Sequence, residues 1–554
     1  MNTATDNGLD IAANQFAQQF GLLACQLGAP AAARRACMRA AQQLIRAQAR
    51  GDLCIWVEKL LGGEFTTLAG LRAALLESAL VCDGRDDDAE LRPLVLDADG
   101  RLYLARYYAF ERRIAHGIAA LARARRLTMI SGGPGTGKTT AVMKMLAEAL
   151  AHTPALRVAL AAPTGKAAQR MLDALAAHAA RLPAALAKRL PQQAFTLHRL
   201  LRAHAMLPYD WVIVDEASML DSALAAQLLG ALAPQSRLIL LGDPNQLAAV
   251  NAGAVFAELA APAACIEDLH PCITVLTRNY RFGSDSVIGQ LAQAVCDGRA
   301  RDALATLPYD TTAIRPGQTD GASLFWIDDI QNLSISALEY LAAGFEPYIA
   351  ALADTVRGAS STPDPAPLFD ALNRYRALAA VRFGPRGVDA LNAMLAAHVR
   401  IHVHGSGMAS DELWFAGRPV MIARNDYALG LFNGDTGIAL PARDGMRVFF
   451  QTPDGGARAF SPMILPPHET AFALTVHKSQ GTEFERIAFV LPAANAPEDL
   501  TARPLTRELV YTAITRARQS ITILGAPDVF AQAIEARTMR MQGLAARLRE
   551  IMDA

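Results

Sequence analysis

The hydrophobic pattern of the chain changes near residue 127. Residues 1–110 are rich in alanine and leucine, and their apolar positions follow the spacing of amphipathic helices. From residue 127, short β-type runs alternate with helical stretches, and each run ends in a polar or glycine-containing loop. This alternation predicts a parallel sheet with helices on both faces and ligands at the carboxyl ends of its strands. The first series of predicted strands is 127–130, 157–161, 211–214 and 237–241, and a helix is predicted at 141–150.

A second α/β series follows, and it contains an insertion. Residues 419–460 hold short β-type runs separated by the turn sequences Asn433-Gly434, Asp444-Gly445 and Asp454-Gly455-Gly456. Because such sequences suit tight hairpin turns, we expect a small antiparallel barrel or meander there. The second series of predicted strands is 273–277, 324–327, 377–381, 471–476, 487–491 and 521–524, with a helix at 507–518.

These patterns predict an α/β protein of several domains. A chain of 554 residues is too long for one core, and ordinary domain sizes suggest about three or four. We expect a helical N-terminal domain at 1–110, which suits either docking or plain scaffolding. A first α/β domain is expected at 111–272 and a second at 273–554, with the β-barrel insertion at 417–464 inside the second.

The composition is that of a globular protein, with 52% hydrophobic and 19% charged residues. The 53 basic and 53 acidic residues cancel, so any binding of nucleic acid must come from local placement of charge. No apolar run approaches the ~20 residues that a membrane span needs, and residues 1–10 show no secretory signal. Seven scattered cysteines without a C-x-x-C pair favour free thiols in a reducing cytoplasm over disulfides or a zinc site.

Residues 132–139 carry the clearest chemical motif. They read GGPGTGKT directly after a predicted strand, which is the P-loop pattern G-x-x-x-x-G-K-[ST]. The glycines let backbone N–H groups point at a phosphate chain, Lys138 reaches the β/γ-phosphates, and Thr139 holds Mg²⁺. The strand–loop–helix context favours this over a glycine-rich turn without a ligand. The residues predicted to bind the nucleotide are Gly132, Gly133, Pro134, Gly135, Thr136, Gly137, Lys138, Thr139 and Thr140.

Two further loops follow predicted strands and carry candidate catalytic residues. Asp215 is placed to hold Mg²⁺, and the adjacent Glu216 is placed to orient and deprotonate the attacking water. Taken alone, this pair could equally be a surface pair; its position 77 residues after Lys138 in the same predicted sheet strengthens the catalytic interpretation. Gln246, in GDPNQL, could contact both the γ-phosphate and the water, and a turn glutamine is its competing interpretation.

Hydrolysis also needs cations on the charge that develops. Arg281, in NYRF, and Arg516, in YTAITRAR, both fall in the predicted second α/β domain. If the two domains face each other, these arginines complete the site across the cleft, as arginine fingers do, and couple hydrolysis to domain motion. Ordinary surface ion pairing is the competing interpretation for each of them.

An ordered set of motifs between about residue 110 and residue 530 resembles the superfamily 1 DNA helicases of the RecD branch. The set is GGPGTGKTT, APTGKAAQRM, TLHRLL, VIVDEASML, LLGDPNQL, LTRNYRF, FALTVHKSQGTEF and LVYTAITRAR. Two further stretches look like the RecD family itself, the alpha subunits of exodeoxyribonuclease V: PLVLDADGRLYLARYYAFE at 93–111 and GRPVMIARNDYALGLFNGDTG at 417–437. The short N-terminal block also suits that family better than its longer stand-alone relatives.

The resemblance implies two RecA-like P-loop motor domains, with ATP and Mg²⁺ between them and single-stranded DNA across their tops. Translocation in this family runs 5′ to 3′. Lys138, Thr139, Asp215 and Glu216 match the phosphate, magnesium, metal-ligand and catalytic-base positions. Gln246, Arg281 and Arg516 match the γ-phosphate group, and Glu483 matches a ribose-contacting position.

The resemblance also implies a set of residues that contact the DNA strand. Small hydroxyls, amides and backbone N–H groups suit this task because they hold phosphates without reading sequence. For His198, packing between helices is the competing interpretation. The implied DNA-binding residues are Pro163, Thr164, Gly165, Lys166, His198, Asn433, Thr475, His477 and Lys478.

The expected activity is ATP-driven DNA unwinding within a RecBCD-type complex that acts in double-strand break repair and recombination. Its implied partners are single-stranded DNA, duplex DNA ends and the beta and gamma subunits of a heterotrimer. No nuclease carboxylate cluster stands out, so cutting is expected from a partner. Residues 107–118 lack the glutamine with which many relatives read adenine, so the preference for ATP rests on the resemblance. The alternatives are a stand-alone helicase and a regulatory subunit whose nucleotide site governs assembly.

Overall fold

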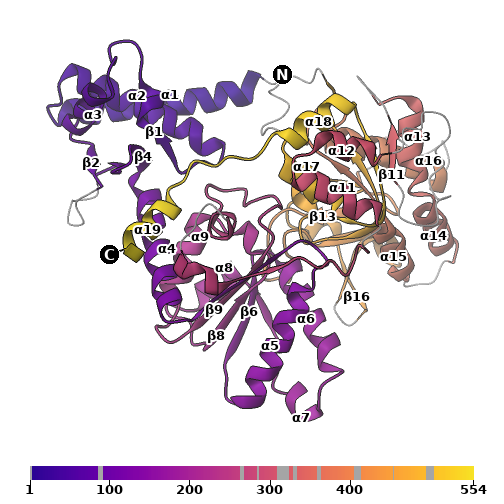
Figure 1. The fold of residues 1–554 in the computed structure, drawn as a ribbon. Helices are drawn as coiled ribbons and strands as arrows, with labels where there is room; N and C mark the ends of the chain where they lie inside the picture. Colours follow the sequence, from indigo (N-terminus) through magenta and orange to yellow (C-terminus); the bar gives the residue numbers. More distant parts are fainter. Residues whose placement is uncertain are drawn as a thin grey trace.

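The computed structural model contains two parallel sheets, a smaller N-terminal unit and an antiparallel insertion (Figure 1). It describes residues 3–84, 92–261, 267–283, 286–307, 324–327, 333–358, 363–404, 413–452, 455–494 and 505–553. No helix within these ranges is long and apolar enough to cross a membrane. The six cysteines that the structure describes are free thiols.

The N-terminal unit combines helices with a sheet that the sequence pattern missed. Its four strands are only three or four residues long, too short to give a clear alternating pattern in an alanine- and leucine-rich segment. The sheet has the order β1-β4-β3-β2. Its helices are α1 (Thr3–Gln26), α2 (Ala31–Ala49) and α3 (Leu68–Glu77), and its strands are β1 (Cys54–Trp56), β2 (Val81–Asp83), β3 (Leu94–Leu96) and β4 (Arg101–Leu104).

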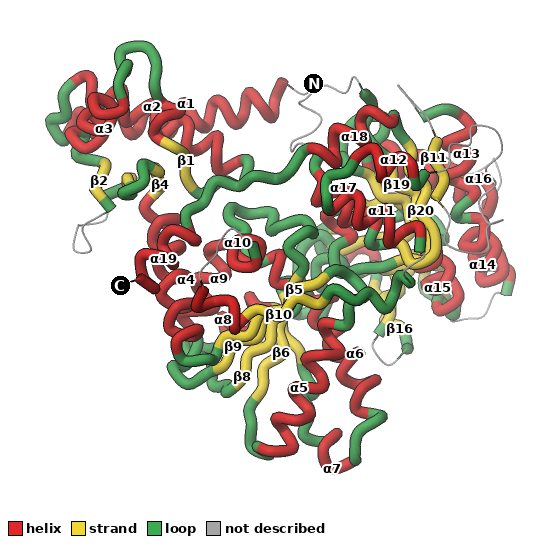
Figure 2. Tube along the Cα trace, viewed as in Figure 1, coloured by secondary structure: helices red, strands yellow, loops and turns green. Residues whose placement is uncertain are grey.

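The first large sheet is parallel throughout and has the order β10-β5-β9-β8-β6-β7. Helices cover both of its faces, which explains why its strands are nearly continuous apolar runs (Figure 2). Within β8, Val212 and Val214 join one core while Ile213 joins the other. The strands are β5 (Leu127–Gly132), β6 (Val158–Ala162), β7 (Ala194–Thr196), β8 (Trp211–Val214), β9 (Arg237–Gly242) and β10 (Ile273–Leu276), and the helices are α4 (Ala105–Arg123), α5 (Lys138–His152), α6 (Gly165–Ala179), α7 (Ala184–Ala187), α8 (Leu197–Ala203), α9 (Ser222–Ala231) and α10 (Val255–Ala260).

Strand β10 corrects the predicted domain boundary at residue 273. The sequence pattern assigned this strand to the second α/β series, yet it pairs in parallel with β5, with Ile273 opposite Met129. A hydrophobic run indicates a strand but carries no information about which sheet the strand joins. The first α/β unit therefore extends to Leu276 at least.

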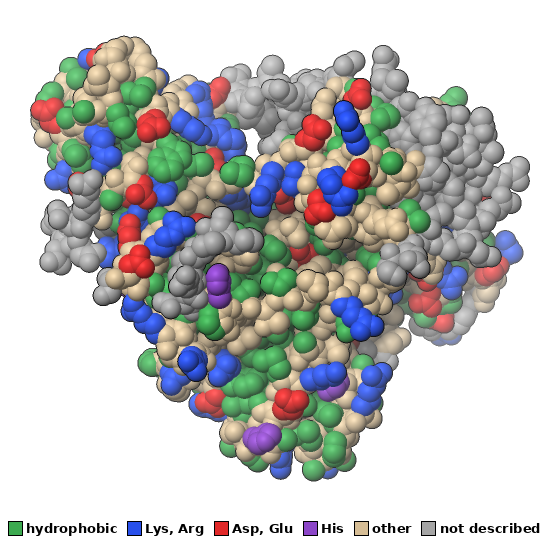
Figure 3. Space-filling model, in the orientation of Figure 1, with side chains coloured by type: hydrophobic (Ala, Val, Ile, Leu, Met, Phe, Trp, Pro, Cys, Tyr) green, Lys and Arg blue, Asp and Glu red, His purple; other side chains and the backbone are tan. Residues whose placement is uncertain are grey.

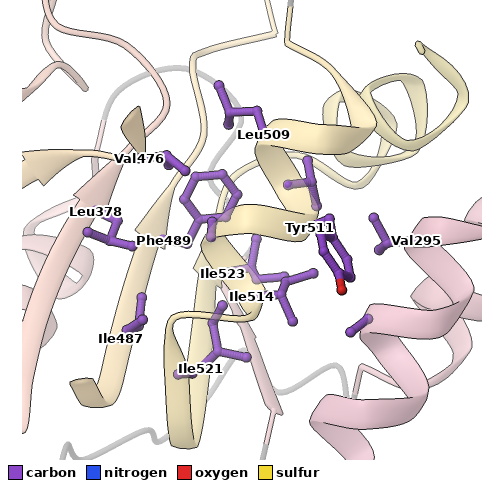
Figure 4. Close-up of a cluster of buried hydrophobic side chains, with 14 of the residues drawn as sticks. Val295, Leu378, Val476, Ile487, Phe489, Leu509, Tyr511, Ile514, Ile521 and Ile523 are labelled. Carbon is purple, nitrogen blue, oxygen red and sulfur yellow. The ribbon is translucent and has the colours of Figure 1, made fainter. Parts of the chain in front are cut away.

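The second large sheet is also parallel and has the order β11-β20-β19-β12-β18. Figure 4 shows the apolar cluster on one face, where Ile487, Phe489 and Ile521 pack beneath α17. Helix α17 ends at Ile514, four residues before the predicted end at 518, because Ala517 already begins β20. The strands are β11 (Leu324–Ile327), β12 (Tyr375–Ala379), β18 (Ala473–Thr475), β19 (Phe484–Val490) and β20 (Ala517–Leu524), and the helices are α11 (Val287–Cys296), α12 (Ala300–Ala305), α13 (Ile335–Ala343), α14 (Glu346–Arg357), α15 (Ala366–Arg374), α16 (Val388–His404), α17 (Arg507–Ile514) and α18 (Pro527–Glu535).

The insertion is a five-stranded antiparallel sheet of order β16-β15-β14-β13-β17. Gly434 and Gly445 lie at its turns with φ of 94° and 107°, a conformation that glycine adopts without strain. The third predicted turn falls partly outside the described residues. Because β17 pairs with β13, the sheet extends beyond the predicted end at 464. Its strands are β13 (Pro419–Ile422), β14 (Thr436–Ala442), β15 (Gly445–Gln451), β16 (Ala457–Phe460) and β17 (His468–Thr470).

The C-terminal residues leave the second sheet and return to the first, which corrects the predicted range 273–554 for the second domain. Residues 537–543 run without helix or strand toward α19 (Leu544–Asp553), and α19 packs on α4 (Figure 1). Leu544 and Leu548 belong to the core of the first sheet. Arg547 Nη2 also donates to Asp97 Oδ2 at 2.8 Å in a buried ion pair, so this helix is bonded to the N-terminal unit as well.

Two buried glutamates receive the backbone N–H groups at the start of α19. Glu111 accepts from Gly543 N at 2.7 Å, and Glu258 accepts from Ala545 N at 2.9 Å. Burial raises the pKa of Glu111 to about 8, and the charge of Glu258 adds to the shift. Since the folded state holds this proton up to about pH 8 and the unfolded chain releases it near 4.5, folding stability is lost as the pH rises between these values.

We expect Glu111→Gln to become progressively more stable than the unmodified chain as the pH rises from about 5 to about 8. One pKa unit corresponds to about 1.4 kcal/mol, so the difference at pH 8 is roughly 4 kcal/mol at most. Thermal unfolding at several pH values measures it, with Glu148→Gln on the exposed side of α5 as the control. A difference that does not change with pH would contradict a buried, neutral Glu111.

Candidate active site

The P-loop joins β5 to α5 at the carboxyl edge of the first sheet. Gly135 and Gly137 have φ of 80° and 83°, and a Cβ on Gly135 would lie 2.4 Å from the Cβ of Arg281, so glycine is required there. Lys138 Nζ donates to the carbonyl oxygens of Gly132 and Gly133, the latter at 3.0 Å. The loop therefore holds an ammonium group beside the positive end of a 15-residue helix, an arrangement that attracts anions.

Asp215 and Glu216 follow β8 at the same edge of the sheet. Glu216 has φ of 53°, a left-handed conformation that is uncommon for a side chain other than glycine and that is found disproportionately at functional sites. Its backbone N–H donates to Asp215 Oδ1 at 2.8 Å. Burial raises the pKa of Asp215, and the charge of Glu216 adds to this, while Lys138 opposes it. Two carboxylates close together beside a lysine are a suitable environment for a divalent cation.

Asp243, after β9, organises a buried hydrogen-bond cluster. Its carboxylate accepts from the Tyr511 hydroxyl at 3.1 Å, from Gln246 Nε2 at 3.2 Å and from Asn245 N at 3.0 Å. Burial raises the pKa of Asp243, and the charge of Lys138 opposes the shift. Tyr511 lies on α17, and Figure 4 shows its ring at the side of the apolar cluster, between Ile514 and Val295. The cluster therefore fixes the Gln246 amide and bonds the first sheet to a helix of the second.

Arg281 lies over the P-loop on the segment that leaves β10. Asn279 Nδ2 donates to Pro134 O at 3.0 Å, and Tyr280 N donates to Gly135 O at 2.9 Å, which ties this segment to the loop. Arg281 Nη2 donates to Glu483 Oε1 at 2.6 Å. Arg281 therefore lies on the segment between β10 of the first sheet and the second unit, whose core already includes the neighbouring Phe282. Its carboxylate partner Glu483 comes from the second unit, and the predicted role of Arg281 across the cleft stays a prediction.

Arg516 is the cation that the second sheet supplies. It lies in the turn between α17 and β20 with 2% of its surface exposed. Its Nε donates to Thr512 O at 3.2 Å and its Nη1 to Thr482 O at 3.1 Å. Burial lowers the pKa of Arg516, whereas the charges of Glu216 and Glu483 oppose the shift. The guanidinium thus lies in the electrostatic field of one carboxylate from each sheet.

Glu483 joins these cations from the start of β19. Arg281 Nη2 and Arg518 Nε both donate to its carboxylate, the latter at 3.0 Å. Burial alone would raise the pKa of Glu483, but the charges of Arg281, Arg170, Arg516 and Arg518 outweigh it and lower the pKa. Glu483 is therefore ionised at neutral pH and belongs to the same charged cluster as Arg281, which lies over the P-loop.

Known proteins match the chain over both halves of this site. Residues 115–316 match the family model of an AAA domain, and residues 470–524 match that of a UvrD-like helicase C-terminal domain. The RecBCD enzyme subunit RecD of Mycolicibacterium smegmatis is 37% identical over 494 residues, which cover 86% of this chain and 81% of that protein. RecD of Haemophilus influenzae is 31% identical over 475 residues, which cover 76% and 70% of the two chains. The chain belongs to the RecD family.

A RecD2 helicase matches this RecD family member over a smaller share of its own length. The ATP-dependent RecD2 DNA helicase of Deinococcus radiodurans is 32% identical over 434 residues, which cover 76% of this chain but 50% of that protein. The match therefore covers a larger share of the two RecD subunits, 81% and 70%, than of RecD2, 50%.

Two of the nine DNA-contacting residues that the RecD resemblance implied line one cavity of about 950 Å³. Gly165 and Lys166 at the start of α6 line it from the first unit, and Gly434, next to Asn433, lines it from the insertion. A Cβ on Gly165 would lie 3.0 Å from the Phe432 side chain, so these two loops are in contact. Burial lowers the pKa of Lys166 to about 8, with Arg170 and Arg376 adding to the shift and Asp435 opposing it.

The remaining implied DNA residues lie outside the lining of this cavity. Thr164 caps α6 by accepting from Ala167 N at 3.2 Å, and Thr475 accepts from Lys478 N at 3.3 Å. Lys478 Nζ forms an ion pair with Glu469. His198 is exposed on α8, which disfavours a role as a buried packing residue. Pro163 and His477 are half-buried in the loops after β6 and β18. Figure 3 shows basic and acidic side chains interspersed on one face of the described residues, in keeping with the zero net charge.

The sequence analysis missed three polar groups of the site. Asp243 directly follows a strand, as Asp215 does, so its position alone could have identified it. Asn279 and Tyr511 have no such signal, because their bonds to Pro134 and Asp243 span 145 and 268 residues. Contacts of this kind appear only when segments far apart in the sequence are placed together.

Proposed function

We propose that this chain is the ATP-dependent 5′-to-3′ DNA helicase subunit of a RecBCD-type complex that processes duplex DNA ends. The observation that carries the proposal is the charged cleft between the two parallel sheets. Lys138, Asp215 and Glu216 come from the first sheet, and Glu483 and Arg516 from the second. Arg516 lies in the field of Glu216, and Glu483 lies in the field of Arg170 on α6 and pairs with Arg281. Such a cleft couples phosphate chemistry to the relative position of two domains.

Residues of the P-loop are proposed to bind the triphosphate, with Lys138 on the β/γ-phosphates. The Thr139 hydroxyl and the Asp215 carboxylate supply the hard oxygen ligands that Mg²⁺ prefers, and the lysine-flanked carboxylates of the site fit its charge. A bound magnesium ion would neutralise charge that develops on the phosphates. Glu216 takes the proton of the attacking water, Gln246 orients that water, and Arg281 and Arg516 stabilise the transition state. Glu483 is proposed to give up its bonds to Arg281 and Arg518 when the nucleotide binds and to contact the ribose instead.

Single-stranded DNA is proposed to cross both motor units at the loops after β6, β7, β13 and β18. Thr164, Lys166, Thr475 and His477 present hydroxyls, a cation and backbone N–H groups there, which hold phosphates of any sequence. His198 and Asn433 extend the same path, with Pro163, Gly165 and Lys478 shaping the loops. ATP binding closes the units, hydrolysis and release reopen them, and alternating grip moves the strand.

The proposed division of labour follows the observed units. Residues 1–110 serve as a docking domain; the segments 111–276 and 277–536 form the first and second RecA-like motors. The insertion has its own apolar core, which includes Val420, Val448 and Phe460, and this supports a small barrel-like module that extends from 417 past the predicted end at 464 to Thr470. Residues 107–118 lie within helix α4, which contains no glutamine that could bind adenine. Any preference for adenine must therefore come from other contacts.

We propose a complex with beta and gamma subunits rather than a stand-alone helicase. We also propose a cytoplasmic location, because DNA repair is the proposed task. The match to RecD of Mycolicibacterium smegmatis supports this choice, because it has the higher identity, 37% against 32%, and covers more of this chain, 86% against 76%. A regulatory subunit with an inert nucleotide site is disfavoured because Lys138, Glu216, Gln246 and Arg516 are all present.

Affinity purification of the tagged chain from its native host is expected to recover two larger subunits in equal proportion. Nuclease activity on duplex ends should appear in the recovered complex and be absent from the chain alone. Mass spectrometry of the eluate and a nuclease assay on blunt duplex DNA measure both. A chain that elutes alone and unwinds long duplexes without partners would contradict the subunit assignment and favour the stand-alone alternative.

A further inference from the structure

The loop that follows Gln246 is bonded to the second motor at its beginning. Leu247 N donates to Thr512 Oγ1 at 3.0 Å, and Gln480 Nε2 donates to Leu247 O at 2.8 Å. Both partners belong to the second motor unit, next to Arg516 and Glu483. The first residue after the proposed water-orienting amide is therefore held by the opposite side of the cleft.

Arg540, on the C-terminal segment, contacts three carbonyl oxygens in the remainder of the loop, beside the bond of Asn251 Nδ2 to Asp221 at 2.8 Å and that of Ser222 N to Ala252 O at 3.3 Å. Arg540 Nη1 donates to Asn251 O at 2.9 Å and to Gly253 O at 2.6 Å, and Nη2 donates to Ala249 O at 2.5 Å. A planar guanidinium fork can satisfy three carbonyls in fixed directions, which a lysine cannot do. Arg540 thus fixes the path of residues 249–253.

The N-terminal unit contributes the third support at this junction. Gly253 N donates to Gly51 O at 3.1 Å, and a Cβ on Gly51 would lie 3.1 Å from the Arg540 guanidinium. The neighbouring residue Met541 donates from its N to Asp52 Oδ1 at 2.9 Å and accepts from Leu53 N at 2.8 Å. The N-terminal unit, the C-terminal segment and the loop therefore meet at Arg540.

We propose that Arg540 is a positioning residue for ATP hydrolysis: it sets the geometry of the loop after Gln246 and transmits the position of the N-terminal unit to that amide. The inference rests on the proposed function, because it assigns Gln246 a role in hydrolysis. Arg540 contacts backbone carbonyls of the loop and acts on the reaction only through them. Displacement of Gln246 by as little as 1 Å lowers turnover without removing any group that binds the phosphates.

Arg540→Ala in the full-length chain is expected to lower the kcat of DNA-stimulated ATP hydrolysis by on the order of tenfold or more, with the KM for ATP within about twofold of the unmodified value. The kcat of Arg540→Lys should lie between that of Arg540→Ala and that of the unmodified chain. Arg537→Ala, an exposed arginine on the same segment, is the matched control and should behave like the unmodified chain. Amide hydrogen exchange should become faster at residues 247–253 in Arg540→Ala and stay unchanged in the control.

An unchanged kcat together with unchanged exchange at 247–253 would overturn the inference. A parallel loss of kcat, ATP affinity and thermal stability would also overturn it, because it would show a general structural role. If the unmodified chain itself shows no DNA-stimulated hydrolysis, the proposed function fails, and the exchange measurement still decides whether Arg540 holds the loop.

Discussion

Lys138→Gln is expected to abolish DNA-stimulated ATP hydrolysis and, with it, strand separation. The ammonium group lies at the mouth of the P-loop beside the carbonyl oxygens of Gly132 and Gly133, where it faces the proposed β/γ-phosphates. Glutamine fills similar space but brings no charge to a phosphoryl group whose charge grows in the transition state. Turnover should fall by at least about a hundredfold, since single electrostatic donors at such positions contribute this much.

The control for Lys138→Gln is Lys144→Gln, which removes a lysine from the exposed side of the same helix. Both variants should keep the thermal unfolding temperature of the unmodified chain within a few degrees. ATP hydrolysis with and without single-stranded DNA separates them. Equal turnover in the two variants would mean that the P-loop does not drive hydrolysis, and the motor interpretation would have to be abandoned in favour of a structural nucleotide site.

Arg516→Ala is expected to lower ATP turnover on the order of a thousandfold, the range observed for arginine fingers. Arg516 belongs to the second motor and lies in the electrostatic field of Glu216 from the first. The bonds from its Nε to Thr512 O and from its Nη1 to Thr482 O hold the guanidinium in one orientation. Binding of a nonhydrolysable ATP analogue should weaken far less than turnover. Such a difference would show that the arginine acts mainly on the transition state.

Because Arg516 is buried, its removal can also destabilise the second motor, and two further variants separate the effects. Arg516→Lys keeps a positive charge but loses the guanidinium fork, so it should unfold like the unmodified chain and still hydrolyse slowly. Gln519→Ala changes an exposed residue of the adjoining strand β20 and should alter neither property. Full turnover in Arg516→Lys would show that hydrolysis needs only a positive charge at this position and not the two-pronged geometry of the guanidinium group.

Local sequence patterns predicted the elements that carry the nucleotide loops. Residues 211–214 coincide with β8, and the predicted strand at 127–130 and helix at 141–150 lie within β5 and α5. These elements are buried on both faces or follow a glycine-rich loop, so their hydrophobic pattern and turn chemistry leave few alternatives. The order of the loops along the chain then placed Asp215 near Lys138 correctly.

Features that depend on distant partners were beyond the sequence pattern. The short strands β1 to β4 are stabilised by pairing across up to 49 residues, such as Cys54 with Tyr103, and show no alternation of their own. The run TRAR at 515–518 favours helix by propensity, yet β20 takes its second half because it pairs with β19. The sheet that β10 joins also depended on long-range pairing, with Ile273 opposite Met129.

Strand separation on two tailed duplexes tests the account most directly. The chain, with its partners if they co-purify, is mixed with ATP and a duplex bearing either a 5′ or a 3′ single-stranded tail, and the Lys138→Gln form is run beside it. We expect rapid, ATP-dependent separation of the 5′-tailed duplex and little separation of the 3′-tailed duplex. In the Lys138→Gln form, this chain should separate neither duplex. Preference for the 3′ tail by the isolated chain, or equal separation by Lys138→Gln, would contradict the account.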